Sequence, residues 1–125
     1  MRLLDAEATS RALPWGGLLR ALEETLSDHR AGRVQVPLRQ VLPVSATTRW
    51  FLMPAWLEPP ASDLAAVKLI TYAPGNPAQG LPSILGDLLV MRASTGERLA
   101  MLDGPTVAAG RTAAVGLLAA RALAP

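Results

Sequence analysis

The sequence predicts an α+β fold with two N-terminal helices, a mixed or antiparallel sheet of five or six strands, and a C-terminal linking helix. Apolar residues recur at helical spacing before residue 32. From Arg33 to Asp103 the pattern changes to alternating runs separated by turn residues. After Gly104-Pro105 an alanine-rich helical composition returns. Helices segregated from a run of strands in this way are typical of the α+β class.

The N-terminal part contains a short strand candidate and two helix candidates. Residues 2–4 suit an edge strand, and Asp5 suits the N-cap of a helix through Ala12. Pro14 ends that helix and fits the first turn of the next. The second helix carries leucines on one face and ends before Gly32, a typical C′ residue.

The middle part contains the main strand candidates, which are residues 33–45, 49–57, 64–73, 85–93 and 98–103. Pro37 and Pro43 indicate that the first candidate is bent or lies at an edge of the sheet, and Pro54 predicts a break in the second. The turn STGE, residues 94–97, predicts that the last two candidates form a hairpin.

The last helix is expected over residues 108–123. Its only charges are Arg111 and Arg121, and a helix that is apolar nearly all round is expected to be buried on most sides. An apolar helix that ends at Pro125 indicates that the 125 residues are one part of a larger protein.

Composition narrows the function classes. The length of 125 residues fits one domain, and a 50% hydrophobic content indicates that a partner covers some apolar surface. A net charge of +2 with no basic run argues against a nucleic-acid partner. The absence of cysteine excludes disulfides and thiol chemistry, and the single histidine, His29, fits a helix end rather than a metal site. No stretch predicts a membrane span, and the acidic N-terminus argues against a signal peptide, so a cytoplasmic location is expected.

Three cations stand in apolar or structured settings without an acidic neighbour in the sequence. They are Arg39 in VPLRQVL, Lys68 in AVKLITY, and Arg111 at the start of the last helix. A buried cation without a partner is costly, so an anionic ligand such as a carboxylate could complete the site. For any one of them alone, the simpler interpretation is that the side chain extends to the surface.

Other catalytic patterns are weak. A triad of Ser83, His29 and an aspartate (Asp87 or Asp103) lacks a nucleophile-elbow signature. GNPAQG lacks the Lys-Ser/Thr of a phosphate-binding loop, and no G-x-G-x-x-G occurs.

Four segments in order along the chain resemble the ornithine cyclodeaminase/mu-crystallin family. They are AGRVQVPLR (31–39), MPA (53–55), VKLITYAPGNPAQGLPS (67–83) and STGERLAMLDGPTVAAGRTAAVGLLAARALAP (94–125). The most specific part is STGE-x-LAxLDG followed by RTAA. The resemblance implies a subunit of two parts: an α+β part whose sheet packs on that of a second subunit to form a homodimer, and a Rossmann domain that binds NAD or NADP.

The resemblance covers the first of these parts. It implies that residues 1–107 form the substrate-binding and dimerisation domain, and that residues 108–125 lead into a dinucleotide-binding domain absent from this chain. The chain is then a fragment, a truncated gene product or half of a split enzyme, and is expected to be inactive alone.

The resemblance also implies site residues. Arg39, Lys68 and Arg111 match the grip on the substrate carboxylate and the reacting centre, with Lys68 as the catalytic residue. Ser83 matches a contact to the nicotinamide side of the cofactor, which Arg111 also reaches. Two positions depart from the family: Ala108 stands where Thr is usual, and Ile84 where a polar residue is common. Both concern contact with the cofactor.

The expected activity is reduction of a cyclic ketimine carboxylate, such as pyrroline-2-carboxylate, to proline. The segment DGPTV (103–107) resembles the imino-acid reductase branch of the family. The first alternative is ornithine cyclodeaminase, which converts ornithine to proline and ammonia. The second is a non-catalytic truncated binding module, because mu-crystallin shows that the family can serve in binding. A strand followed by G-x-G-x-x-Q/G after residue 125 would favour the enzyme, and a stop codon there would favour the module.

Overall fold

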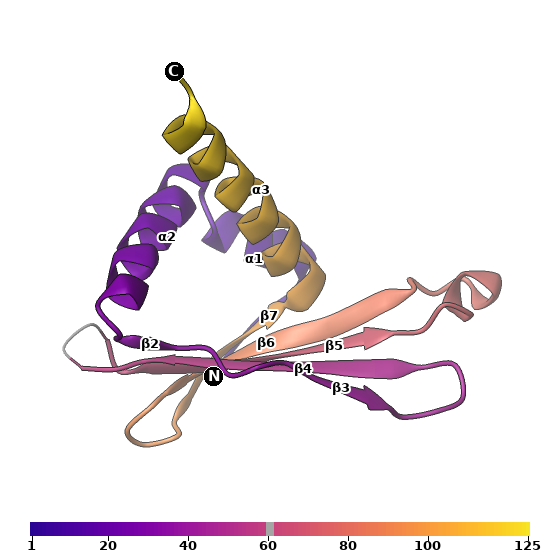
Figure 1. The fold of residues 1–125 in the computed structure, drawn as a ribbon. Helices are drawn as coiled ribbons and strands as arrows, with labels where there is room; N and C mark the ends of the chain where they lie inside the picture. The colour runs from indigo at the N-terminus through magenta and orange to yellow at the C-terminus, as the bar shows by residue number, and fades with distance from the viewer. Residues whose placement is uncertain (60–61) are drawn as a thin grey trace.

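The computed structural model describes residues 1–59 and 62–125, in which three helices lie on one side of a seven-stranded sheet (Figure 1). The elements in chain order are β1 (Arg2–Leu4), α1 (Ala6–Ala12), α2 (Trp15–Arg30), β2 (Val34–Gln35), β3 (Gln40–Pro43), β4 (Arg49–Leu57), β5 (Leu64–Tyr72), a 3₁₀ turn (Asn76–Gln79), β6 (Ile84–Arg92), β7 (Arg98–Asp103) and α3 (Gly104–Leu123).

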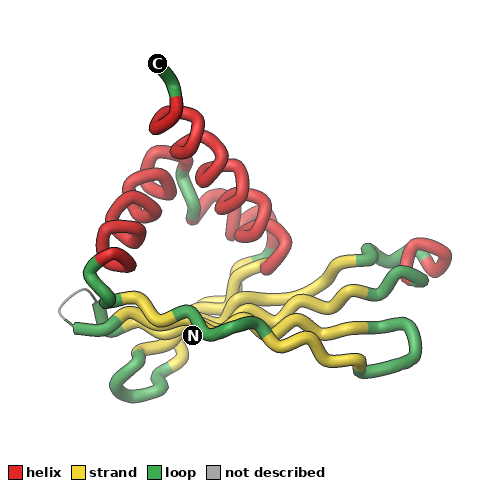
Figure 2. Tube along the Cα trace, in the orientation of Figure 1, coloured by secondary structure: helices red, strands yellow, loops and turns green. Residues whose placement is uncertain are grey.

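The sheet is mixed, with the strand order β1-β7-β6-β5-β4-β2. β1 pairs parallel to β7, and the other pairs are antiparallel. The prediction of five or six strands is wrong. The candidate at 33–45 splits into β2 and β3, which pair one after the other with the same edge of β4 and are joined by a loop (Figure 2).

The predicted break at Pro54 is also wrong, because β4 runs without interruption from Arg49 to Leu57. β3 ends its pairing opposite Leu52, and β2 begins opposite Trp56. Pro54 therefore falls where β4 has a strand neighbour on the β5 side but none in register on the other side. A proline is tolerated at such an edge position because no ladder hydrogen bond is required there.

α3 begins at Gly104, four residues before the predicted start. The Asp103 carboxylate caps it by accepting a hydrogen bond from the Thr106 backbone N–H at 2.9 Å, and Pro105 occupies the first turn. The expectation that this helix is buried on most sides is wrong within this chain. Of its residues Gly104 and Ala114 are buried, because α1, α2 and the sheet contact one side of it.

The junction between β7 and α3 is closely packed and hydrogen-bonded. Thr9 of α1 is fully buried, and its hydroxyl donates to the Leu4 carbonyl at 3.1 Å and accepts from the Asp103 N–H at 3.0 Å. Gly104 lies against the backbone of Gly86 in β6, so close that a Cβ at Gly104 would stand 2.9 Å from the Gly86 carbonyl oxygen. The start of α3 is thus held directly on the sheet.

No helix among the described residues is long and apolar enough to cross a membrane.

Gly86→Ala should destabilise the fold by about 3 kcal/mol or more. Gly86 has a φ of +153°, and an added Cβ would stand 2.0 Å from the Leu69 carbonyl oxygen, where neither backbone can yield. Chemical denaturation of the purified chain measures the loss. Gly116→Ala is the matched control, because nothing lies within 4 Å of that position and alanine favours a helix. Equal denaturation midpoints for the two variants would show that the close contact at Gly86 is not required.

Candidate functional site

Alternation along the strands gives the sheet two different faces. In β5, Ala66, Lys68 and Ile70 point toward the helices, whereas Val67 and Leu69 point away from them. Cross-strand partners share a face, so Met53 of β4 lies beside Lys68 on the helix side. The two faces are therefore chemically separate surfaces.

On the helix side, an open cavity of about 620 Å³ gathers the three cations that the sequence analysis singled out. Arg39 comes from the segment between β2 and β3, Lys68 from the middle of β5, and Arg111 from the second turn of α3. Its other lining residues are apolar or small: Val36, Pro37, Leu38, Met53, Pro54, Ala55, Ala66, Leu88, Val107 and Ala108.

Lys68 is half-buried at the floor of this cavity, between Met53 and Leu88 on the neighbouring strands. Burial lowers the pKa of its ammonium group, and the positive charge of Arg111 lowers this pKa further. Both causes act against the charged form of Lys68. A bound anion would act in the opposite direction and favour it.

Arg39 is held above the floor by an aromatic ring. Its guanidinium carbon lies 5.7 Å from the centroid of the Phe51 ring, within the range of a cation–π contact. Phe51 stands in β4 two residues from Met53, on the same face. The ring supports the cation without neutralising its charge.

The three cations lack acidic partners. The ion pairs among the described residues are Arg11–Glu7, Arg33–Asp28 and Arg92–Glu97, all elsewhere on the chain. No Asp or Glu is found in the lining of the cavity. Three positive groups around one open cavity, with no internal counter-charge in the described part of the chain, are an arrangement that suits an anion such as a carboxylate.

The structure does not bring Ser83 into this cavity. Ser83 lies just before β6, and its carbonyl accepts a hydrogen bond from the Ala73 N–H at 2.8 Å. Lys68 pairs with Leu88, five residues further along β6, which separates the two side chains by roughly 16 Å along the strand. The 3₁₀ turn at the end of the β5–β6 hairpin lies beyond the helices (Figure 1), and Ser83 lies between this turn and β6.

Two features of the site were missed from the sequence. Phe51 is hidden in a run of apolar strand residues, and its contact with Arg39 depends on how the 36–39 segment passes over β4. The Ala55–Ala66 pair in the floor depends on the register between β4 and β5. Strand alternation in the sequence places Phe51 on the same face as Met53. Which residue on the neighbouring strand lies opposite Phe51 depends on the strand register, which the sequence pattern does not give.

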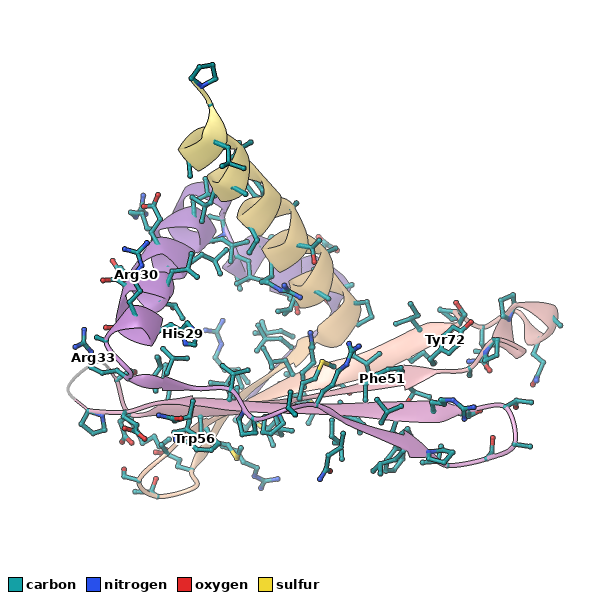
Figure 3. All side chains as sticks on the ribbon, in the orientation of Figure 1. His29, Arg30, Arg33, Phe51, Trp56 and Tyr72 are labelled. Atoms are coloured by element: carbon teal, nitrogen blue, oxygen red, sulfur yellow. The ribbon has the colours of Figure 1, made fainter. Side chains whose placement is uncertain are left out.

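The face of the sheet away from the helices is apolar and uncovered. Trp56 projects from it on the side opposite the helices (Figure 3), and Trp50 is 39% exposed on the same face of β4. A groove of about 440 Å³ runs along it. The groove is lined by Val67, Leu69, Thr71, Leu85, Gly86, Asp87, Leu89 and Met101.

Among the described residues, no three His, Cys, Asp or Glu side chains gather where they could hold a metal ion.

Comparison with known proteins gives consistent matches over nearly the whole chain. Residues 3–125 match the sequence profile of the ornithine cyclodeaminase/mu-crystallin family. The chain is 43% identical over 121 residues to Delta(1)-pyrroline-2-carboxylate reductase 1 of Burkholderia multivorans. The aligned region covers 97% of this chain and 38% of that protein. The chain is also 43% identical, with the same coverage, to the Delta(1)-pyrroline-2-carboxylate/Delta(1)-piperideine-2-carboxylate reductase of Azospirillum brasilense.

A solved structure matches in the same way. The Thermococcus litoralis Delta(1)-pyrroline-2-carboxylate reductase in complex with NADH and L-proline superposes with a TM-score of 0.85 at 29% identity, over all of this chain and 38% of that one. The chain thus spans about 38% of the length of the relatives it matches.

Lys68→Met should stabilise the fold at neutral pH, by less than about 1 kcal/mol because solvent screens a half-exposed charge. The pKa of Lys68 is lower folded than unfolded, so between the folded pKa and 10.5 the unfolded chain binds more protons and stability rises with pH. The advantage of Lys68→Met should therefore fade as pH rises through that window and vanish above 10.5.

Denaturation midpoints across the pH series measure this effect. Lys68→Arg is the matched control, because it keeps a charge throughout the range and should show no such gain. A Lys68→Met variant that is less stable than the original chain at neutral pH would mean that Lys68 is not strained by its surroundings.

Proposed function

Because this chain belongs to the ornithine cyclodeaminase/mu-crystallin family, we propose that it is the substrate-binding and dimerisation part of an NAD(P)-dependent enzyme that reduces a cyclic ketimine carboxylate. Pyrroline-2-carboxylate, with proline as the product, is the preferred substrate. The two reductases that are 43% identical to the chain support this choice.

The observation that carries the proposal is the convergence of Arg39, Lys68 and Arg111 on one cavity without an acidic lining residue. A ketimine carboxylate presents one carboxylate and one imine nitrogen on a small ring. Arg39 and Arg111 suit the carboxylate, which a guanidinium can bind through two parallel hydrogen bonds. Lys68 sits deeper than either arginine and suits the imine.

The chemical roles follow from these positions. NAD(P)H, when bound, supplies a hydride to the imine carbon, and a proton completes the amine at the nitrogen. The arginines fix the ring by its carboxylate, so that the imine carbon faces the open side of the cavity. The Lys68 ammonium donates a hydrogen bond near the imine and makes the imine carbon more electrophilic. Both substrate groups are then held by cations of this chain.

The same lining favours the reductase over the cyclodeaminase alternative. Ornithine carries a second ammonium group, which needs an acceptor or a carboxylate in its site. The described lining contains three cations and no acid, so this ammonium would meet repulsion. A ring without a second charged group avoids that cost.

We assign residues 1–107 to the substrate-binding and dimerisation domain and residues 108–125 to a helix that leads into a dinucleotide-binding domain. Arg111 lies at the open side of the cavity, where it suits contact with both substrate and cofactor. A cofactor contact for Ser83 is supported by the family resemblance alone, since this residue lies at the far end of the β5–β6 hairpin.

We also propose that the protein is a homodimer through the face of the sheet away from the helices. The chain exposes 8270 Å², about 1,900 Å² more than a compact monomer of its 13.2 kDa would expose. A standard interface covers about 800 Å² of each partner. A second sheet packed on the apolar groove and the two tryptophans would cover such an area, and the exposed side of α3 leaves surface for further protein.

The full-length protein should oxidise NADPH or NADH in the presence of pyrroline-2-carboxylate, and Lys68→Ala should abolish turnover while leaving the dimer intact. Absorbance at the nicotinamide band and light scattering measure the two effects. Arg92→Ala is the control, because Arg92 pairs with Glu97 away from the cavity.

The alternatives give other results in the same assay. Formation of proline from ornithine, with no reduction of the ketimine, would contradict the reductase proposal and support the cyclodeaminase alternative. Ligand binding without turnover of either substrate would favour the non-catalytic module. Full activity in Lys68→Ala would make Lys68 a surface-directed strand residue without a catalytic role.

Val67→Lys should convert the dimer to a monomer. Val67 lies in β5, lines the apolar groove and has Pro54 and Leu89 as its register partners, so a charge there would be buried without a partner on association. Sedimentation equilibrium measures the mass. Leu123→Lys is the matched control, because Leu123 is 84% exposed at the end of α3. If the Val67→Lys variant remains dimeric, the subunits associate through another surface.

A further inference from the structure

A second cavity lies next to the cation site on the helix side of the sheet. It has a volume of about 240 Å³ and lies between the second half of α2 and the ends of β4 and β5. Its lining is Thr25, Val34, Ala55, Trp56, Leu57, Leu64, Ala65, Ala66 and Val90. No charged residue is found in this lining, and Thr25 is its polar member.

Ala55 and Ala66 line both cavities. They are direct register partners across β4 and β5, and Met53 with Lys68 is the next pair on the same face. Successive pairs on one face of a sheet are about 7 Å apart along the strands. The apolar cavity therefore begins at the pair next to Met53 and Lys68. Alanine is the smallest side chain that a strand accommodates without the conformational cost of glycine. The two alanines therefore keep a low floor between the cavities.

We propose that the two cavities form one substrate site, with a charged end for the carboxylate and imine and an apolar end for hydrocarbon attached to the ring. This inference rests on the proposed function and extends it. Cyclic ketimine carboxylates that carry an apolar ring substituent are expected to bind more tightly than pyrroline-2-carboxylate itself. A second ammonium group is disfavoured at either end, because cations repel it at one and the apolar lining offers it no partner at the other.

Ala55 and Ala66 are then specificity-determining residues. A branched side chain at either position would stand across the junction and close the apolar end. The charged end would remain, since Arg39, Lys68 and Arg111 come from separate elements. Loss of the large ligand with retention of the small one is therefore the expected signature.

The test uses two planar analogues that share a ring nitrogen and a carboxylate. Pyrrole-2-carboxylate has the small ring, and indole-2-carboxylate adds a fused six-membered ring. Titration calorimetry with the full-length protein should give binding of the indole compound at least about tenfold tighter, because the extra ring carbons are buried against apolar walls.

Ala66→Leu should weaken indole-2-carboxylate binding by about tenfold or more and change pyrrole-2-carboxylate binding by less than about twofold. Ala55→Val, on the opposite strand, should act in the same direction. Retained binding of the pyrrole compound shows that each variant is folded. Ala12→Leu is the control, since Ala12 is exposed at the end of α1.

The outcomes separate this inference from the function on which it rests. Equal affinity of the original protein for both compounds, or an equal loss of both in Ala66→Leu, overturns the joined site alone. Pyrrole-2-carboxylate binding that is unchanged in Arg39→Ala, a variant of a residue assigned to the carboxylate, overturns the proposed carboxylate end. Failure of both compounds to bind overturns the proposed function and this inference together.

Discussion

The close approach of two backbones, at Gly86 in β6 and Gly104 at the start of α3, determines much of the rest of the structure. Because neither residue has a side chain, the helix begins in direct contact with the sheet. The Asp103 cap and the buried Thr9 hydroxyl hold that start in place from the other side. Arg111 lies two turns along this helix, so its position over Lys68 depends on the contact.

Much of the local structure was predictable from the residues. The bounds of β4 and β7 and the Asp5 cap of α1 agree with the sequence pattern, because alternation, turn chemistry and capping are local signals. The division of 33–45 into β2 and β3, and the continuity of β4 through Pro54, were not predictable. Both depend on which neighbouring strand pairs where, and single-residue propensities carry no such information.

The candidate site shows the same limit. The absence of an acidic neighbour marked Arg39, Lys68 and Arg111 from the sequence, and the fold brings these three together. Phe51 and the pair Ala55–Ala66 carry no chemical signal of their own. They matter through what lies opposite them, which register decides.

The alternation of side chains along β5 constrains how this chain can evolve. Lys68 lines the cavity on the helix side, whereas its neighbours Val67 and Leu69 line the groove on the opposite face. Inserting or deleting one codon within this strand would reverse the two sets, placing a cation in the apolar groove and a leucine in the anion site. Such length changes are therefore tolerable in the hairpin ends but forbidden within β5, where the proposed ligand site and the proposed dimer surface would be lost in one genetic event.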